Sequence, residues 1–164
     1  MALKADRYEL QTDISFFYNA EAVTRGGVVV HDSTTASGAA MDQGVNLVKY
    51  KTCGASDVPV GILLNDVVNK DLTRTHLNEH KDEVQLGGKV TILRKGYVVT
   101  NNITGTPSVG DPAFASATKG EIGNSAASAA ATGNLIIGRF LTDMDEDGYC
   151  KVEINLPNFG PAAL

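Results

Sequence analysis

Apolar and polar residues alternate in short runs along most of this chain, which is the pattern of half-buried β-strands rather than of helices. The alternation is clear in residues 14–19 (ISFFYN) and 45–52 (VNLVKYKT). Residues 84–101 (VQLGGKVTILRKGYVVTN) read as strand, turn, strand, turn, strand, with Val90 and Ile92 on one face of the middle strand. We therefore predict a mainly β protein, built as a single β-barrel or β-sandwich domain.

One strand-like phrase occurs twice, as VPVGILLNDV in residues 58–67 and as LIIGRFLTDM in residues 135–144. An alignment without gaps matches Gly61 with Gly138, Leu64 with Leu141, and Asp66 with Asp143. Each copy follows a glycine turn, a short strand and a connector of small residues, which predicts two pseudo-repeated halves within the domain. In each copy the glycine would permit a bend or a close backbone approach, and the aspartate would form a turn after the strand. Chance similarity of two apolar strands is the alternative.

Polar composition at both ends of the chain suggests three segments. Residues 1–13 are polar and mixed, without a sustained period, and we expect them to form an extended N-terminal arm. Residues 14–157 hold the strand patterns and form the β-rich domain, and residues 158–164 form a C-terminal tail. The charged stretch 65–83 is the least strand-like part of the domain, and it reads as a short helix or a long excursion.

Three consecutive aromatic residues, Phe16, Phe17 and Tyr18, stand at the start of the predicted domain. A strand would send Phe16 and Tyr18 to one face and Phe17 to the other. One interpretation is an ordinary core strand. The other is an anchor whose outward ring packs on another subunit, and these three residues are our candidates for such a contact.

Composition and charge narrow the classes of function. The 164 residues are 43% hydrophobic and 20% charged, which suits one globular domain. The net charge is −5 and the fourteen Lys and Arg residues are scattered, so we expect no nucleic-acid partner. No apolar run has the length of a signal peptide or membrane helix, so we expect no membrane partner and synthesis in a cytoplasm. In that setting Cys53 and Cys150 are expected to be free and mostly buried.

The sequence HLNEH, residues 76–80, fits a zinc-binding pattern of metallopeptidases. On a helix, His76 and His80 would share a face, and Glu79 would act as the general base. The pattern needs a third protein ligand on a downstream helix, and no later segment reads as a helix. A solvated charged segment is the better interpretation.

The acidic sequence DMDEDG, residues 143–148, begins like a calcium-binding EF-hand loop. The loop pattern then fails, because its twelfth position is Ile154 instead of glutamate and strands flank it instead of helices. We interpret it as an acidic hairpin turn and expect no metal and no cofactor. The chain also lacks a G-x-S-x-G motif and a P-loop, so we expect that it is not an enzyme.

Several turns and strands of the second half together resemble the head decoration (cement) proteins of tailed bacteriophages. They are a Gly-Asp-Pro turn before a short strand, a connector of small residues, GNLIIGRFLTD (133–143), DEDG (145–148) and CKVEINLP (150–157). Residues 58–101 are similar to proteins of phage structural-gene clusters, so the resemblance covers about two thirds of the chain. It implies a β-tulip-like or barrel domain, often a homotrimer, on the outside of an icosahedral capsid.

The resemblance leads us to expect a non-enzymatic virion protein that is made in the host cytoplasm, binds the outer capsid surface and stabilises the lattice. Its implied partners are the major capsid protein and further copies of itself. A tail or baseplate component is the first alternative, since such parts are also β-rich and oligomeric. A small zinc hydrolase that uses the HLNEH segment is the second.

Overall fold

β-strands form the framework of this protein. The computed structural model describes residues 3–21, 23–32, 46–54, 57–64, 83–84, 86–124 and 136–157. The strands are β1 (Leu3–Tyr18), β2 (Val23–Thr24), β3 (Val28–His31), β4 (Leu47–Lys49), β5 (Pro59–Leu63), β6 (Glu83–Val84), β7 (Lys89–Thr100), β8 (Ile103–Thr104), β9 (Pro112–Ala115), β10 (Ile122–Gly123), β11 (Ile136–Phe140) and β12 (Cys150–Asn155). The predicted mainly β class is confirmed. In the described part of the chain, no helix has the length and apolarity to span a membrane.

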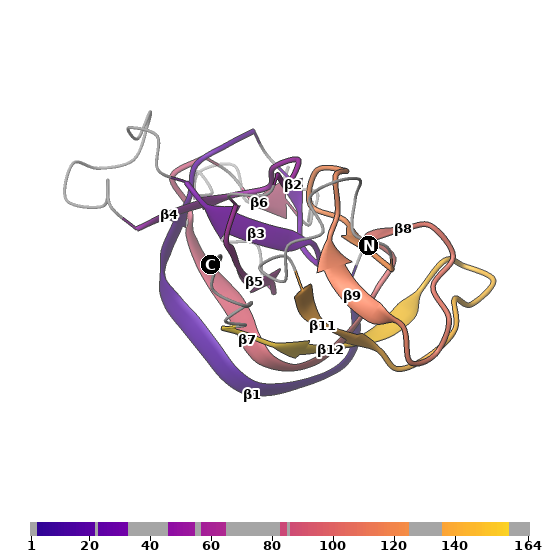
Figure 1. Ribbon diagram of the computed structural model, residues 1–164. Coiled ribbons are helices and arrows are strands. Elements are labelled where there is room, and N and C mark those ends of the chain that lie inside the picture. The colour runs from indigo at the N-terminus through magenta and orange to yellow at the C-terminus, as the bar shows by residue number, and fades with distance from the viewer. Residues whose placement is uncertain are drawn as a thin grey trace, which may run out of the picture.

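The first half of the chain closes into a barrel (Figure 1). Hydrogen bonds join its strands in the order β1, β4, β3, β5, β7, and β7 then pairs with β1. The pairing of β1 with β4 is parallel, and the other pairs are antiparallel. Because β7 pairs with β1, the ring is closed, and none of the five strands has a free edge where it is paired on both sides.

The second half has a strand order equivalent to that of the first, and strand β7 belongs to both halves. Beyond β7 the order is β12, β11, β9, β10, β8. Strand β8 begins at Ile103, soon after β7 ends at Thr100, so this circuit starts and finishes on one stretch of chain. The pairing of β10 with β8 is parallel, like that of β4 with β1 in the first half.

The two halves carry the same irregularity at the same place. Where β5 pairs with β3, the register skips Val60, the residue before Gly61. Where β11 pairs with β9, it skips Ile137, the residue before Gly138. Both skipped residues are β-bulges, which bend a strand and increase its twist.

Matching hydrogen bonds tie each bulged strand to a glycine turn. The N–H of Gly26 donates to the carbonyl of Leu63 (2.8 Å), and the N–H of Gly110 donates to the carbonyl of Phe140 (2.9 Å). Gly26 and Gly110 both have positive φ, 100° and 90°. A shared bulge and a shared turn go beyond a chance likeness of two apolar strands, so the predicted pseudo-repeat is present in the fold. Asp66 lies outside the described residues.

Strand β7 departs from the sequence prediction. Residues 84–101 were expected to contain a second turn after Leu93, yet β7 runs without a break from Lys89 to Thr100. The residue that suggested the turn, Gly96, keeps a positive φ of 138° inside the strand. Pairing with β1 along its whole length holds β7 extended through this position.

Strand β1 crosses the boundary expected between residues 13 and 14. It pairs with β7 from Leu3 to Phe17. Most of its residues before Ile14 are exposed on both faces. Residues 3–13 are therefore extended, and their backbone is part of the sheet.

The strands enclose two adjoining hydrophobic cores. One fills the first barrel and includes Tyr18, Val29, Val48, Tyr50, Val60, Leu63, Val90 and Ile92. The other fills the second half and continues onto the outer face of the first; it includes Leu3, Ile62, Leu64, Leu93, Val98, Ile137, Phe140, Cys150, Val152 and Ile154. The second core therefore also joins the two halves.

Two tyrosines in the first core make stability depend on pH in alkali. Burial raises the pKa of Tyr18 to about 12 and raises that of Tyr50 as well. Between pH 10 and 12 the unfolded chain loses phenol protons that the folded chain retains. Urea denaturation is therefore expected to show stability that declines as the pH rises above about 9, first through the buried thiols of Cys53 and Cys150 and then through the two tyrosines. Tyr18→Phe should make this decline shallower, and an unchanged slope would contradict the assignment.

Candidate interaction surface

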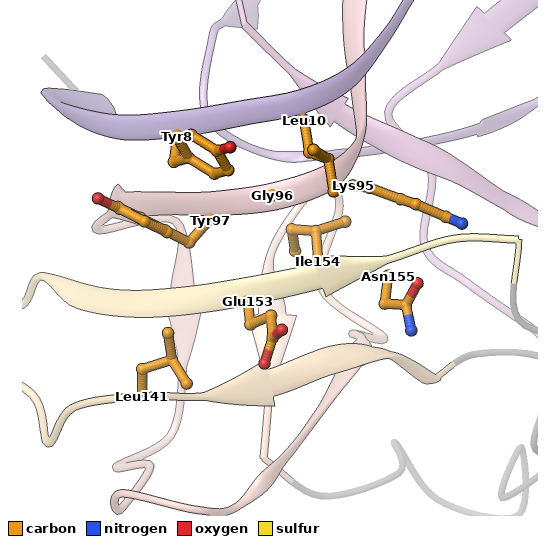
Figure 2. A pocket seen from close by; sticks show the side chains of 9 residues that line it. All are labelled: Tyr8, Leu10, Lys95, Gly96, Tyr97, Leu141, Glu153, Ile154 and Asn155. Atoms are coloured by element: carbon orange, nitrogen blue, oxygen red, sulfur yellow. The ribbon is translucent and has the colours of Figure 1, made fainter.

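A groove crosses the outer face of four neighbouring strands drawn from both halves of the domain. Figure 2 shows its side chains on β1, β7, β12 and the end of β11. The groove has a volume of about 470 Å³. Its lining includes Tyr8, Leu10, Lys95, Tyr97, Leu141, Glu153 and Asn155.

Large apolar side chains are exposed in this groove. Leu10 is 66% exposed and Tyr8 is 55% exposed, both on β1, and Leu141 on the opposite side is also exposed. Scattered surface leucines are ordinary, but several that gather in one hollow mark a contact site for another molecule. The groove is therefore a candidate interaction surface.

Close backbone packing forms the floor of the groove. Gly96 of β7 lies opposite Glu9 of β1, and a Cβ at this glycine would overlap the carbonyl oxygen of Tyr8. The absence of a side chain lets β1 lie directly against β7. The rings of Tyr8 and Tyr97 then stack with their centres 6.0 Å apart.

Charged contacts hold the beginning of β1 onto the second half. The Nζ of Lys151 lies 3.8 Å from the centre of the Tyr97 ring and 3.8 Å from a carboxylate oxygen of Asp6. The Nζ of Lys4 lies 3.1 Å from Oδ2 of Asp145 and 4.0 Å from the centre of the Tyr149 ring. These contacts fix the strand that supplies Tyr8 and Leu10, although each exposed ion pair contributes little stability by itself.

The acidic segment 143–148 forms a turn, as predicted. Oδ1 of Asp145 accepts hydrogen bonds from the backbone N–H groups of Asp147 (3.1 Å) and Tyr149 (2.7 Å). The bond from Tyr149, aided by the Lys4 ammonium group, lowers the pKa of this carboxyl. Asp143 accepts a bond from the N–H of Val109 (2.8 Å), which links the turn to the loop before β9.

The three aromatic residues proposed as contacts do not share one environment. Tyr18 is fully buried, and its ring meets Tyr50 edge-on with the ring centres 6.0 Å apart. Phe16 and Phe17 are partly buried, and Phe16 packs against His31 with ring centres 5.5 Å apart. An intermolecular contact by Phe16 and Phe17 stays a prediction, while Tyr18 supports them from inside the barrel.

Sequence reasoning missed Tyr8 and Leu10. They fall in residues 1–13, where both faces of the strand are exposed and the alternation of buried and exposed positions is lost. The available signal was two large apolar residues, separated by one residue, within the polar stretch of residues 6–13. Their neighbours in the groove come from distant strands, so the sequence alone did not bring them together.

The candidate metal ligands and the two cysteines have the following places in the structure. His76, Glu79 and His80 lie outside the described residues. Among the residues that the structure describes, no three His, Cys, Asp or Glu side chains are grouped to hold a metal ion. Cys53 and Cys150 are free and buried, as predicted, and burial raises the pKa of each thiol to about 11.

Comparison with known protein families identifies the chain. The family model described as "Structural cement protein (E217 gp24/Pam3 gp6)" matches residues 9–155. The chain belongs to the phage structural cement protein family. The match runs from the middle of β1 to the last residue of β12, so it includes both halves of the domain. A search of curated proteins gives no match.

Membership of the cement protein family assigns a role to this chain. A cement protein has a structural role: it is part of the virion capsid and stabilises it. The matched residues include Leu10, Tyr97 and Leu141 of the groove. Neither the described residues nor the family comparison supports a tail component or a zinc hydrolase.

Proposed function

We propose that this cement protein binds the outer surface of an icosahedral phage capsid as a homotrimer and contacts the major capsid protein. The observation that carries the proposal is the family match over residues 9–155, which covers both halves of the β domain from the middle of β1 to the end of β12. Made in the host cytoplasm, the protein would join capsids that assemble there. This role needs no catalytic step and no cofactor.

The net charge supports a place outside the capsid. At −5, with cationic residues spread among anionic ones, the chain has no composition suited to binding packaged DNA. Ion pairs in the described residues show the same mixing of positive and negative charge. Four cationic side chains each lie close to an aspartate: Lys4, Lys49, Lys51 and Arg94. Protein partners therefore suit this surface better than phosphate does.

Binding to several capsid subunits at once would supply the stabilisation. A trimer presents three copies of each contact, so individually weak contacts add up to high avidity. A protein that binds the assembled lattice and not the free subunits shifts the equilibrium towards the lattice. Phe16 and Phe17, which are partly exposed, are the proposed contact residues with another copy or with the capsid.

Capsids that lack this protein provide the test. Purified cement protein should co-sediment with them in hundreds of copies per particle, and it should raise the temperature at which they release DNA. Bovine serum albumin at the same concentration is the control. A few to dozens of copies would indicate a tail component, and saturation without a gain in capsid stability would contradict the proposed role.

A further inference from the structure

The two halves differ in how they use one equivalent face. All five residues of β5 are buried, whereas in β11 Ile137 and Phe140 are buried and the other three residues are not. The registers identify the matching positions: Ile62 pairs with Leu93 in the first half, and Arg139 pairs with Glu153 in the second. An apolar pair in one half thus corresponds to a charged pair in the other.

The apolar face of the first half is covered within the chain. Ile62, Leu64 and Leu93 belong to the same continuous core as Ile137 and Phe140 of the second half. The matching face of the second half carries the groove. There Leu141, the equivalent of the buried Leu64, is exposed beside Glu153, and Tyr8 and Leu10 extend the apolar surface.

We propose that a second copy of this chain covers the groove formed by Tyr8, Leu10, Tyr97 and Leu141, an inference that rests on the proposed homotrimer. The internal repeat supports a second copy as the molecule that covers the groove. The same face of the first half is already covered by β-structure of this chain, and another copy supplies β-structure of the same kind. The charged residues Arg139 and Glu153 at the groove are exposed to water in the free chain. Such residues suit an interface that forms after each chain has folded.

A ring of three copies needs two different surfaces on each copy, because its contacts are head-to-tail. The groove is one of them. The second is assigned to Ile14, which is 59% exposed, with the partly exposed Phe16 two residues further along the strand. Both surfaces lie on β1, the groove nearer its beginning and the Ile14 surface nearer its end.

The test measures molar mass by size-exclusion chromatography with light scattering. The wild-type chain should have three times the 17.2 kDa of one chain, and Leu10→Asp and Ile14→Asp should each have the mass of one chain. Val109→Asp is the matched control, because Val109 is 62% exposed and lies outside the groove. Circular dichroism checks that each variant is folded, and Leu141→Asp tests the opposite side of the groove.

Mixing the two defective variants gives a sharper result. Leu10→Asp keeps its Ile14 surface and Ile14→Asp keeps its groove, so an equal mixture should form pairs with twice the mass of one chain. Failure to form pairs would overturn the assignment of the Ile14 surface. A wild-type monomer, or a Leu10→Asp trimer, would overturn the groove assignment.

Capsid binding by the same proteins separates this inference from the proposed function. If Leu10→Asp keeps the wild-type mass but no longer binds capsids, the groove contacts the capsid and not a second copy. If Leu10→Asp still forms a trimer and the wild-type chain stabilises capsids, the groove assignment fails and the proposed function stands. Loss of capsid stabilisation by the wild-type chain contradicts the function itself.

Discussion

Phe140→Ala is expected to lower the free energy of unfolding by about 3–5 kcal/mol. Phe140 ends β11 and is fully buried in the core that joins the two halves. Its backbone is held on both sides, by the N–H of Gly110 and the carbonyl of Asp111, so the site cannot collapse around a smaller side chain. The substitution would therefore leave a cavity in addition to the lost burial.

Urea denaturation followed by circular dichroism measures the effect of Phe140→Ala. Val109→Ala is the control, because its side chain is 62% exposed and it stands next to the glycine turn that holds Phe140. This control should change stability by no more than about 0.5 kcal/mol. A loss below about 1 kcal/mol in Phe140→Ala would show that the second core does not bear on global stability.

Gly138→Ala is expected to cost about 3 kcal/mol, the upper end of the usual cost of overpacking. Gly138 pairs with Ile154 of β12 and with Ala113 of β9, next to the bulge at Ile137. A Cβ at this position would overlap the carbonyl oxygen of Glu153. The obstacle is backbone, which cannot rotate away as a side chain can, so β11 and β12 would have to separate.

Gly110→Ala is the matched control for Gly138→Ala. Gly110 has a φ of 90°, but a Cβ there would meet no heavy atom within 4 Å. Its expected cost is the left-handed backbone alone, roughly 1–2 kcal/mol. The comparison therefore distinguishes crowding from backbone conformation. Equal losses at the two glycines would mean that strand contact at Gly138 is less tight than the structure shows.

The repeat was predictable because it rests on local chemistry. Gly61 and Gly138 each lie against the backbone of a neighbouring strand. A Cβ at Gly61 would overlap the carbonyl oxygen of Leu93, and a Cβ at Gly138 would overlap that of Glu153. The apolar residues around them show the alternation of a half-buried strand. Such constraints act on the residue that carries them, so they leave a trace in the sequence.

The remaining features depend on partners far away in the chain. Residues 3–13 of β1 are held mainly by backbone bonds to β7, which any side chain permits, so no alternation identifies the strand. The break expected near Gly96 is absent because β1 pairs across it. The groove joins residues about 130 positions apart, such as Leu10 and Leu141, and only the strand order brings them together.

The sharing of β7 has a mechanical consequence. One part of this strand pairs with β5 in the barrel, and the other part pairs with β12 of the second half. A load applied to either half is therefore passed to the other through covalent bonds and not only through side-chain packing. The shared strand would therefore resist separation of the two halves when the protein stabilises a capsid.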